Sequence, residues 1–323
     1  MKVVRYSPEA AAAWDAFVET SRNGTFLFRR GYMDYHADRF EDHSLLVLDE
    51  KERPLALLPA NINRDQLHSH GGLTYGGFII DRRMTVQLML EVFDASLQFL
   101  GDAGIARLLY KCVPHIYHEQ PAEEDLYALY RLRARLVRRD HLAVIDYRDR
   151  YAMQERRARA VRKAARQGLE VRESHDFAPF WEVLTDNLQS RYGVKPVHTL
   201  AEITLLKSRF PDAIRLLCAF KGAEVRAGAV VYASRGVAHV QYNAASPAGK
   251  EEGALDVILD FLTGHYSSSK RYFDFGVSTE QQGMYLNTGL AEYKEGFGAR
   301  TVVHDFYELD VTSYDTDSLR NVR

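Results

Sequence analysis

The feature that most constrains the fold is an internal repeat, in which the same short patterns occur twice and in the same order. SRNG at residues 21–24 returns as SRYG at residues 190–193, and RFED at residues 39–42 returns as RFPD at residues 209–212. The offset stays at about 165–170 residues, which is too long for a solenoid repeat and fits a duplicated domain. We therefore predict that the chain contains two related domains.

The elements of each half follow from its hydrophobic pattern. Each half reads as helix, helix, β-hairpin, strand around one tyrosine (Tyr75, then Tyr242), helix and closing strand. Hairpin strands pair antiparallel, whereas a strand–helix–strand step gives a parallel pair. We predict an α/β (α+β) fold with domains at residues 1–146 and 147–323. Each is expected to hold a mixed, mostly antiparallel sheet flanked by helices.

The composition favours a globular protein in a reducing compartment. Hydrophobic residues make up 46% of the 323 residues, and the formal net charge of −2 demands neither nucleic acid nor membrane. Cys112 and Cys218 both lie in apolar runs, so we expect buried thiols and no disulfide. The start, MKVVRYSPEA, lacks a signal-peptide apolar region, and no apolar run is long enough to span a bilayer. We expect a cytoplasmic protein with no transmembrane segment and no DNA partner.

A basic helix is predicted at about residues 153–167. Its cations fall at helical spacing on one face: Arg156, Arg159, Lys163 and Arg166. The helix predicted before it adds further cations: Arg131, Arg135, Arg138 and Arg139. The basic face is either solvated or a wall that faces the phosphates of a nucleotide or of RNA. Arg159 and Lys163 are therefore candidates for substrate binding.

A small-residue turn, SPAGK at residues 246–250, joins a strand that ends near Ala245 to a helix that begins near Gly253. Free backbone N–H groups at a helix start, with glycines and a lysine beside them, are typical of an anion site. The same layout also fits an ordinary helix cap, since the acids at positions 251 and 252 suit any first turn. The candidates for binding a donor are Asn243, Gly249, Lys250 and Gly253.

These patterns together resemble the GNAT acyltransferase superfamily and, more narrowly, its Fem-type (FemAB-like) members. KEEGAL at residues 250–255 resembles the acyl-CoA loop [Q/R]-x-x-G-x-[G/A] at its glycine and departs from it at Lys250 and Leu255. RRARAVRKAARQGLEV is similar to the opening of the second Fem-type domain, and FDFG followed by GLAEYKEGFGAR is similar to its ending. The resemblance implies tandem GNAT-like domains that transfer an acyl or aminoacyl group to an amine, often in assembly of the cell wall or surface polysaccharide.

The resemblance also implies roles for two residues. Lys294 matches the lysine that supports the substrate, and Asp274 matches the acidic residue at the DFG-like strand end. The alternatives are a lysine that packs its stem on aromatic neighbours and an aspartate that caps a turn. An attacking amine must lose a proton, so a carboxylate or a histidine is needed nearby. Asp274, Glu280 and His239 are candidates by position, although His239 also fits a core histidine and Glu280 a loop residue. Tyr242 is placed to contact the acyl group.

The first half lacks the donor turn, since IIDRRMTVQ has no glycine at its helix start. We expect this half to be degenerate for cofactor and to bind the acceptor, with Tyr75 and Lys111 as its candidates. The glycines of GGLTYGGF would permit a ligand to approach a strand closely. HIYHE at residues 115–119 has no third ligand, so we predict no metal site.

The prediction is an N-acyltransferase with Lys294, Asp274, Glu280 and Tyr242 as candidate catalytic residues. It transfers an acyl group from acyl-CoA to an amine on a sugar- or peptide-linked envelope or polysaccharide precursor, by direct attack in an inter-domain cleft. No cofactor is expected to stay bound, and the acceptor is a small molecule or a nucleotide- or lipid-linked sugar. Two alternatives stay open: a Fem-type peptidyltransferase that uses aminoacyl-tRNA, and a non-catalytic tandem-GNAT scaffold.

Overall fold

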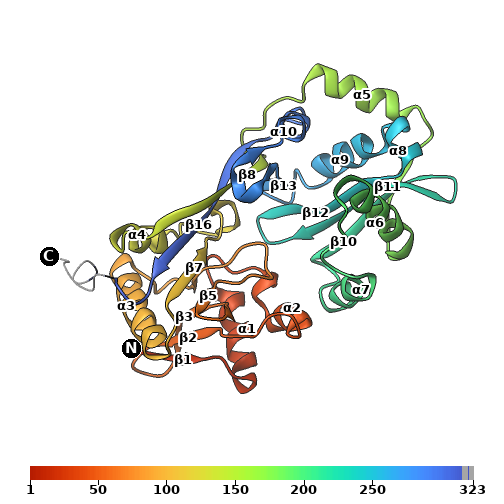
Figure 1. Cartoon of the computed structure of the whole chain (residues 1–323). Coiled ribbons are helices and arrows are strands. Elements are labelled where there is room, and N and C mark those ends of the chain that lie inside the picture. Colours follow the sequence, from red (N-terminus) through yellow and green to blue (C-terminus); the bar gives the residue numbers. More distant parts are fainter. Residues whose placement is uncertain (315–318, 320–323) are drawn as a thin grey trace. The chain divides into compact units, whose positions relative to one another are not determined.

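The computed structural model describes residues 1–314 and residue 319, and it divides the chain into two compact units (Figure 1). Unit 1 comprises residues 1–140, 282–284 and 303 onward, and unit 2 comprises residues 141–281 and 285–302. Two long strands, β8 (Arg135–Asp146) and β16 (Arg300–Asp310), contribute residues to both units. The last strand, which the repeat counts with the second half, therefore gives most of its residues to unit 1.

Unit 1 contains two sheets. The first has the order β1-β2-β3-β6, and the second has the order β4-β5-β7-β16, followed by the first part of β8. The strands are β1 (Lys2–Arg5), β2 (Leu45–Leu48), β3 (Pro54–Leu58), β4 (Asn61–Asn63), β5 (Gln66–His68), β6 (Ile79–Ile80) and β7 (Arg107–Lys111). The helices are α1 (Ala11–Thr20), α2 (Arg30–Met33), α3 (Val86–Asp102) and α4 (Glu124–Arg131), with 3₁₀ turns at Pro8–Ala10, Phe26–Phe28, Asp34–His36 and His115–Tyr117.

Unit 2 contains one larger sheet in the order β8-β13-β12-β11-β10-β9. Its strands after β8 are β9 (Glu170–Ser174), β10 (Ile214–Lys221), β11 (Glu224–Ala233), β12 (Val237–Ala245) and β13 (Tyr272–Val277). A small separate hairpin pairs β14 (Thr279–Glu280) with β15 (Tyr285–Leu286), and a 3₁₀ turn at Gln281–Gly283 lies between them. The helices are α5 (Glu155–Ala165), α6 (Ala178–Tyr192), α7 (Leu200–Arg209), α8 (Pro247–Glu252), α9 (Ala254–His265) and α10 (Thr288–Glu295).

Helices cover both faces of the unit 2 sheet (Figure 1). Alternate residues of β11, such as Ala229 and Val231, pack against Ile258 and Leu262 of α9 in one core. Gly228 faces the other way and lies under the ring of Phe180 on α6. β10 and β11 pair antiparallel, whereas β12 and β13 pair parallel through the crossover helix α9. The predicted antiparallel hairpin and parallel crossover are confirmed here.

Two predicted elements of the first half were wrong. The segment around Tyr75 is a loop, and only the two residues of β6 pair in a sheet. Its glycines serve tight packing, because a Cβ on Gly76 would meet the Ser69 carbonyl oxygen at 1.5 Å, and Gly77 has φ of +84°. The helix predicted to continue past residue 131 ends there instead.

The chain turns at Arg133, which has φ of 54°, and then forms β8. The later arginines of the predicted helix therefore lie on a strand: Arg135, Arg138 and Arg139. Arg139 forms an ion pair with Asp305 of β16. The arginine-rich segment has no strong hydrophobic periodicity, neither helical nor alternating. It is a strand because it pairs with strands far along the chain.

The packing of Gly228 predicts a large stability difference between two glycine positions. Gly228→Ala would bring a Cβ within 2.2 Å of the Phe180 ring, so we expect the free energy of unfolding to fall by about 1–3 kcal/mol. Gly236→Ala is the control, since its Cβ would meet no atom within 4 Å, and it should be neutral or stabilise by less than about 1 kcal/mol. Urea unfolding measures both, and equal effects would contradict this packing.

Candidate active site

A cavity of about 520 Å³ lies within unit 2, where the end of β12 meets the starts of α9 and α10. Its walls come from α6, β12, α8, α9, α10 and the residues that cap them. They are Asn187, Arg191, Asn243, Ala244, Ala245, Gly249, Lys250, Gly253, Leu255, Asp256, Asn287, Gly289, Leu290 and Tyr293. The structure thus brings together all four residues predicted to bind the donor, although binding itself stays a prediction.

The predicted SPAGK turn is the short helix α8, which Gly253 joins to α9. Ser246 caps α8, and its Oγ accepts the N–H of Gly249 at 3.1 Å, so this N–H already has a partner. A Cβ on Gly249 would lie 2.0 Å from the carbonyl oxygen of Arg226 on β11. Gly253 has φ of +71°, and a Cβ there would meet Ala164 of α5 at 2.9 Å. Both glycines are therefore required by the fold, whether or not a phosphate approaches them.

One carboxylate in the cavity wall, that of Asp256, accepts hydrogen bonds from two side chains. Tyr293 donates its hydroxyl hydrogen to Asp256 Oδ1 at 2.6 Å, and Arg157 Nη1 donates to the same oxygen at 2.9 Å. The Arg157 guanidinium also lies 4.1 Å from the centre of the Tyr293 ring. Burial, together with the charge of Asp256, raises the pKa of Tyr293 well above its usual value. Tyr293 is therefore a protonated hydrogen-bond donor at neutral pH.

The sequence did not predict Arg157 or Asp256 as site residues. Arg157 stands among the other arginines of α5, whose exposed face gives the stronger pattern. It shares the inward face with Val161 and Ala164, at i+4 and i+7, and that spacing was the available signal. Asp256 is an acid in the first turn of α9, a position where acids are common in any helix, so its place in the sequence did not indicate a function.

His239 and Asp274 meet where two strands separate. β12 pairs with β13 over Val237–His239 and Tyr272–Asp274, and this pairing does not continue past His239 in the part of the chain that the structure describes. At that last pair, His239 Nδ1 lies 2.9 Å from Asp274 Oδ2. Asp274 Oδ1 accepts the N–H of Gly276 at 2.7 Å, and the aspartate is 1% exposed.

Lys294 is buried rather than solvated. Its Nζ donates to the carbonyl oxygens of Gly276 at 2.9 Å and Val277 at 2.6 Å, at the end of β13. Burial lowers the pKa of Lys294 to about 8, while the charge of Asp274 acts in the opposite direction. Lys294 is not among the residues that line the cavity, whereas Leu290 and Tyr293 on the same helix are.

The other two catalytic candidates have partners of their own. The Tyr242 hydroxyl lies 2.5 Å from His198 Nδ1, and burial raises the pKa of Tyr242 to about 12. Glu280 is exposed and accepts from Asn287 Nδ2 at 2.9 Å. Asn287 lines the cavity and caps α10 through Leu290 N–H. Glu280 is therefore linked to the cavity through one residue.

Of the unit 1 candidates, Tyr75 is buried and Lys111 is partly buried. The Tyr75 hydroxyl donates to Thr25 Oγ1 at 3.0 Å, and its ring contacts Phe28 and Tyr117. Lys111 donates to the carbonyl oxygens of His70, at 3.0 Å, and Leu73. Burial lowers the pKa of Lys111 to about 7, and the nearby positive charge of Arg138 acts in the same direction. Arg159 and Lys163, by contrast, are exposed on α5.

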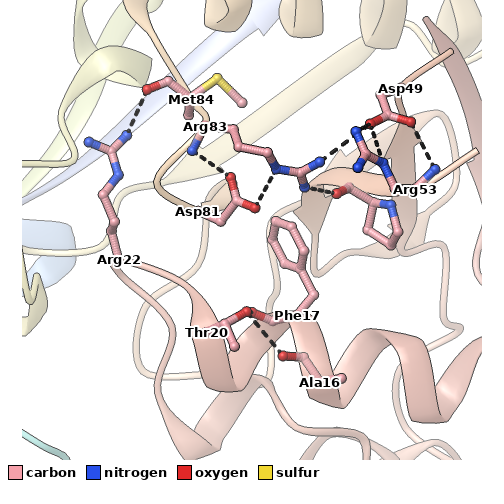
Figure 2. A network of polar contacts seen from close by, with 10 residues as sticks. Ala16, Phe17, Thr20, Arg22, Asp49, Arg53, Asp81, Arg83 and Met84 are labelled. Atoms are coloured by element: carbon pink, nitrogen blue, oxygen red, sulfur yellow. Dashed lines mark hydrogen bonds and ion pairs between the residues drawn. The ribbon is translucent and has the colours of Figure 1, made fainter. Parts of the chain in front are cut away.

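The unit 1 counterpart of the donor turn is held by ion pairs, which Figure 2 shows. Arg83 Nε donates to Asp81 Oδ2 at 2.8 Å within the turn itself. Arg83 Nη1 and Arg53 Nη2 lie 3.3 Å and 2.8 Å from Asp49 Oδ2. The hydrogen bonds from Arg53 lower the pKa of Asp49 to about 2. The polar groups of this unit 1 turn therefore bind one another, whereas the corresponding turn of unit 2 lines the cavity.

Within residues 1–314 and 319, no three His, Cys, Asp or Glu side chains gather in a way that could hold a metal ion. Over the same residues, every helix is too short or too polar to cross a bilayer.

Comparison with known proteins finds a family match in the second half of the chain. Residues 148–295 match the family model of the GNAT acetyltransferase domain, and no curated protein matches the sequence. Solved structures match nearly the whole chain. FemX superposes with a TM-score of 0.65 at 10% identity, covering 94% of this chain and 97% of FemX.

Two other structures are similar in the same way. The C-terminal domain of a putative lysylphosphatidylglycerol synthetase from Agrobacterium fabrum gives a TM-score of 0.61 at 14% identity, covering 93% and 91% of the two chains. A tandem GNAT protein from the clavulanic acid biosynthesis pathway gives 0.51 at 10% identity, covering 97% and 99%. At such identities the likeness shows the fold, and it confirms the predicted tandem GNAT-like architecture.

The residues that line the cavity of unit 2 all fall inside the matched family domain. Residues 148–295 thus match the GNAT acetyltransferase domain, and the chain as a whole has the fold of FemX and of the tandem GNAT protein.

Proposed function

We propose that the protein transfers an acyl group from acyl-CoA to an amine on a sugar- or peptide-linked envelope or polysaccharide precursor. Unit 2 binds the donor and carries out the transfer, and unit 1 binds the acceptor. The observation that carries the proposal is the 520 Å³ cavity of unit 2, which lies within the GNAT domain. A cavity of this size is in the range of small-molecule and cofactor sites.

The chemistry of the cavity walls fits a donor with both anionic and amide groups. Arg191 and Lys250 place two cations in the wall, and the cavity lies at the first turn of α9, whose N-terminus favours an anion. Arg157 binds the one carboxylate among the wall residues, Asp256, so that this acid repels a phosphate less. The edge of β12 that leaves β13 after His239 offers backbone groups to the amide-containing arm of CoA.

The side chains support direct attack by the amine. Cys112 and Cys218 are both buried, and burial raises the pKa of Cys218 to about 12 and that of Cys112 far above its usual value. Neither thiol is therefore an activated nucleophile. Tetrahedral intermediates of acyl transfer need fixed donors near the carbonyl oxygen, and backbone N–H groups of the free β12 edge can supply them.

The acceptor side of the proposal rests on the repeat and on the fold. In the unit 1 turn that corresponds to the donor turn, Arg83 binds Asp81 and Asp49, so these charged groups already have partners, which supports loss of donor binding there. One structure with this fold is named as a lysylphosphatidylglycerol synthetase, which supports an acceptor from the cell envelope.

One observation favours a second donor, aminoacyl-tRNA. The outward face of α5 and its C-cap expose a row of cations: Arg156, Arg159, Lys163 and Arg166. The helix that carries this row packs beside α9, which begins at the cavity. Such a row would bind an RNA backbone mainly through phosphate contacts.

The two donors predict different products. With an amine panel of amino sugars, nucleotide-linked amino sugars and lysine peptides, incubation with acyl-CoAs should give acylated amine and free CoA by mass spectrometry. The variant in which the four exposed α5 cations become glutamine should keep this activity within about threefold, since exposed charges contribute little to a small-molecule site. Transfer from charged tRNA alone, lost in the same variant, would replace acyl-CoA as the donor. Transfer from neither would leave the non-catalytic scaffold.

The two cations of the cavity predict how the donor is held. In Arg191→Met/Lys250→Met, the KM for acetyl-CoA should rise about 10-fold or more, because each lost charge-assisted hydrogen bond is worth about 1.5–3 kcal/mol. The KM for acetyl-pantetheine, which has no phosphate, should not change. Lys51→Met in unit 1 is the matched exposed control. An equal rise in KM for both donors would contradict phosphate binding at these residues.

The buried state of Lys294 predicts how stability depends on pH. Its folded pKa of about 8 lies below the usual value of about 10.4, so between these values the unfolded chain binds more protons and the free energy of unfolding rises with pH. From pH 7 to 9.5 we expect a rise of about 2 kcal/mol from this residue, at 1.36 kcal/mol per unit. Lys294→Met should remove that rise, whereas Lys195→Met, at an exposed position, should keep it. Urea unfolding at several pH values measures the slope, and an unchanged slope in Lys294→Met would show that the lysine is not buried in this way.

A further inference from the structure

We propose that His239 is the base that accepts the proton of the attacking amine, and that Asp274 is the positioning residue that orients it. The inference rests on the proposed acyl transfer and names the residue that completes it. Acyl transfer to an amine requires such a base, and Asp256, the one carboxylate among the cavity-wall residues, already accepts hydrogen bonds from Arg157 and Tyr293.

The hydrogen bond to Asp274 fixes which nitrogen of His239 can act as the base. A carboxylate accepts hydrogen bonds, so Asp274 Oδ2 at 2.9 Å holds the proton on Nδ1 of the neutral ring. The lone pair is then on Nε2. The Asp274 carboxylate is itself held by Gly276 N–H and is buried, whereas the His239 side chain keeps 12% of its surface exposed. An orienting acid behind a partly exposed histidine is the arrangement that a base requires.

The place of His239 in the sheet matches that role. It is the last residue of β12 that pairs with β13, so its ring stands where the free edge of β12 begins. Its neighbours Ala238 and Val240 point into the core with α9, so His239 lies on the opposite face, towards α6 and α7. A donor along the free edge would bring its carbonyl carbon past this point, and an amine would approach from the His239 face.

Of the charged and titratable groups around the His239 ring, the imidazole itself is the one available to accept a proton. Tyr232 is opposite on β11, Asp274 is on β13, and Lys294 reaches from α10 to the carbonyl oxygen of Gly276. Lys294 Nζ is occupied by two carbonyl oxygens. A Cβ on Gly276 would be 3.4 Å from His239 Cε1, so the glycine leaves room beside the ring.

The proton balance of the step closes within the site. The amine nitrogen forms the C–N bond, the C–S bond breaks, and its electron pair leaves on sulfur as a thiolate. Nε2 of His239 takes one proton from nitrogen, and the resulting imidazolium is stabilised by the Asp274 carboxylate. His239 then passes that proton through water to the thiolate, so that the amide and the free thiol are formed and the enzyme returns to its starting state.

Kinetics of two variants test the assignment, with acetyl-CoA and the best amine of the panel. In His239→Gln we expect kcat to fall by about 10²- to 10⁴-fold with the KM for acetyl-CoA unchanged, and the acid limb of the kcat–pH profile to disappear. Asp274→Asn should lower kcat less and shift that limb. Added imidazole should restore part of the activity of His239→Gly. His175→Gln, at an exposed position of unit 2, is the matched control and should behave as the wild type.

The outcomes separate this inference from the function on which it rests. An active wild type with an equally active His239→Gln, or an unchanged pH profile, would overturn His239 as the base and leave the acyl transfer standing. A wild type that transfers no acyl group from any donor would overturn the proposed function, and the base with it. Nitrogen-15 NMR of the histidine rings gives a readout that needs no activity: the inference requires His239 to carry its proton on Nδ1, and a proton on Nε2 in the neutral ring would contradict it.

Discussion

Parallel pairing joins β12 to β13 over three residue pairs only, and the candidate site depends on where that pairing stops. Beyond His239 and Asp274 each strand has backbone groups that no longer meet the other strand, and buried polar groups without partners are costly. The structure meets this constraint in two ways. On β13, the ammonium of Lys294 binds the carbonyl oxygens of Gly276 and Val277. On β12, the separated stretch leads to Asn243 at the cavity, where a ligand or water can meet the backbone.

Several residues that look functional in the sequence have a structural reason as well. The carbonyl oxygen of Arg226 leaves no room for a side chain at position 249. At position 253, the left-handed backbone and Ala164 of α5 both disfavour any residue other than glycine. Through these contacts β11 packs closely against α8, and α5 packs closely against the start of α9. Both glycines also line the cavity in which we propose that the donor binds. The basic helix divides in the same way, since Arg157 turns inward to Asp256 while the other cations stay exposed. Structural need and function are therefore compatible at these positions.

Much of the fold was predictable because its signals are local and occur twice. The repeat, the hairpins and the strand–helix–strand step follow from apolar periodicity, and the residues at the turn near Gly253 do line one cavity. Partners far along the chain were not predictable. The first part of β8, up to about residue 139, reads locally as a continued helix and is fixed by pairing, and the glycines around Tyr75 serve loop packing instead of a strand. The bond between His239 and Asp274 links residues 35 positions apart, and only the fold shows that a histidine in an apolar strand has an acidic partner.

The most direct measurement is the crystal structure of the protein with acetonyl-CoA, in which a methylene group between the sulfur and the carbonyl carbon turns the reactive thioester into an unreactive ketone. The account predicts phosphate density at Arg191 and Lys250, the amide arm along the free edge of β12, and the ketone next to the point where β12 and β13 separate. The ketone carbon would then lie on the side of the sheet that carries His239. Analogue bound at another surface, or an empty cavity in unit 2 at saturating analogue, would contradict the account.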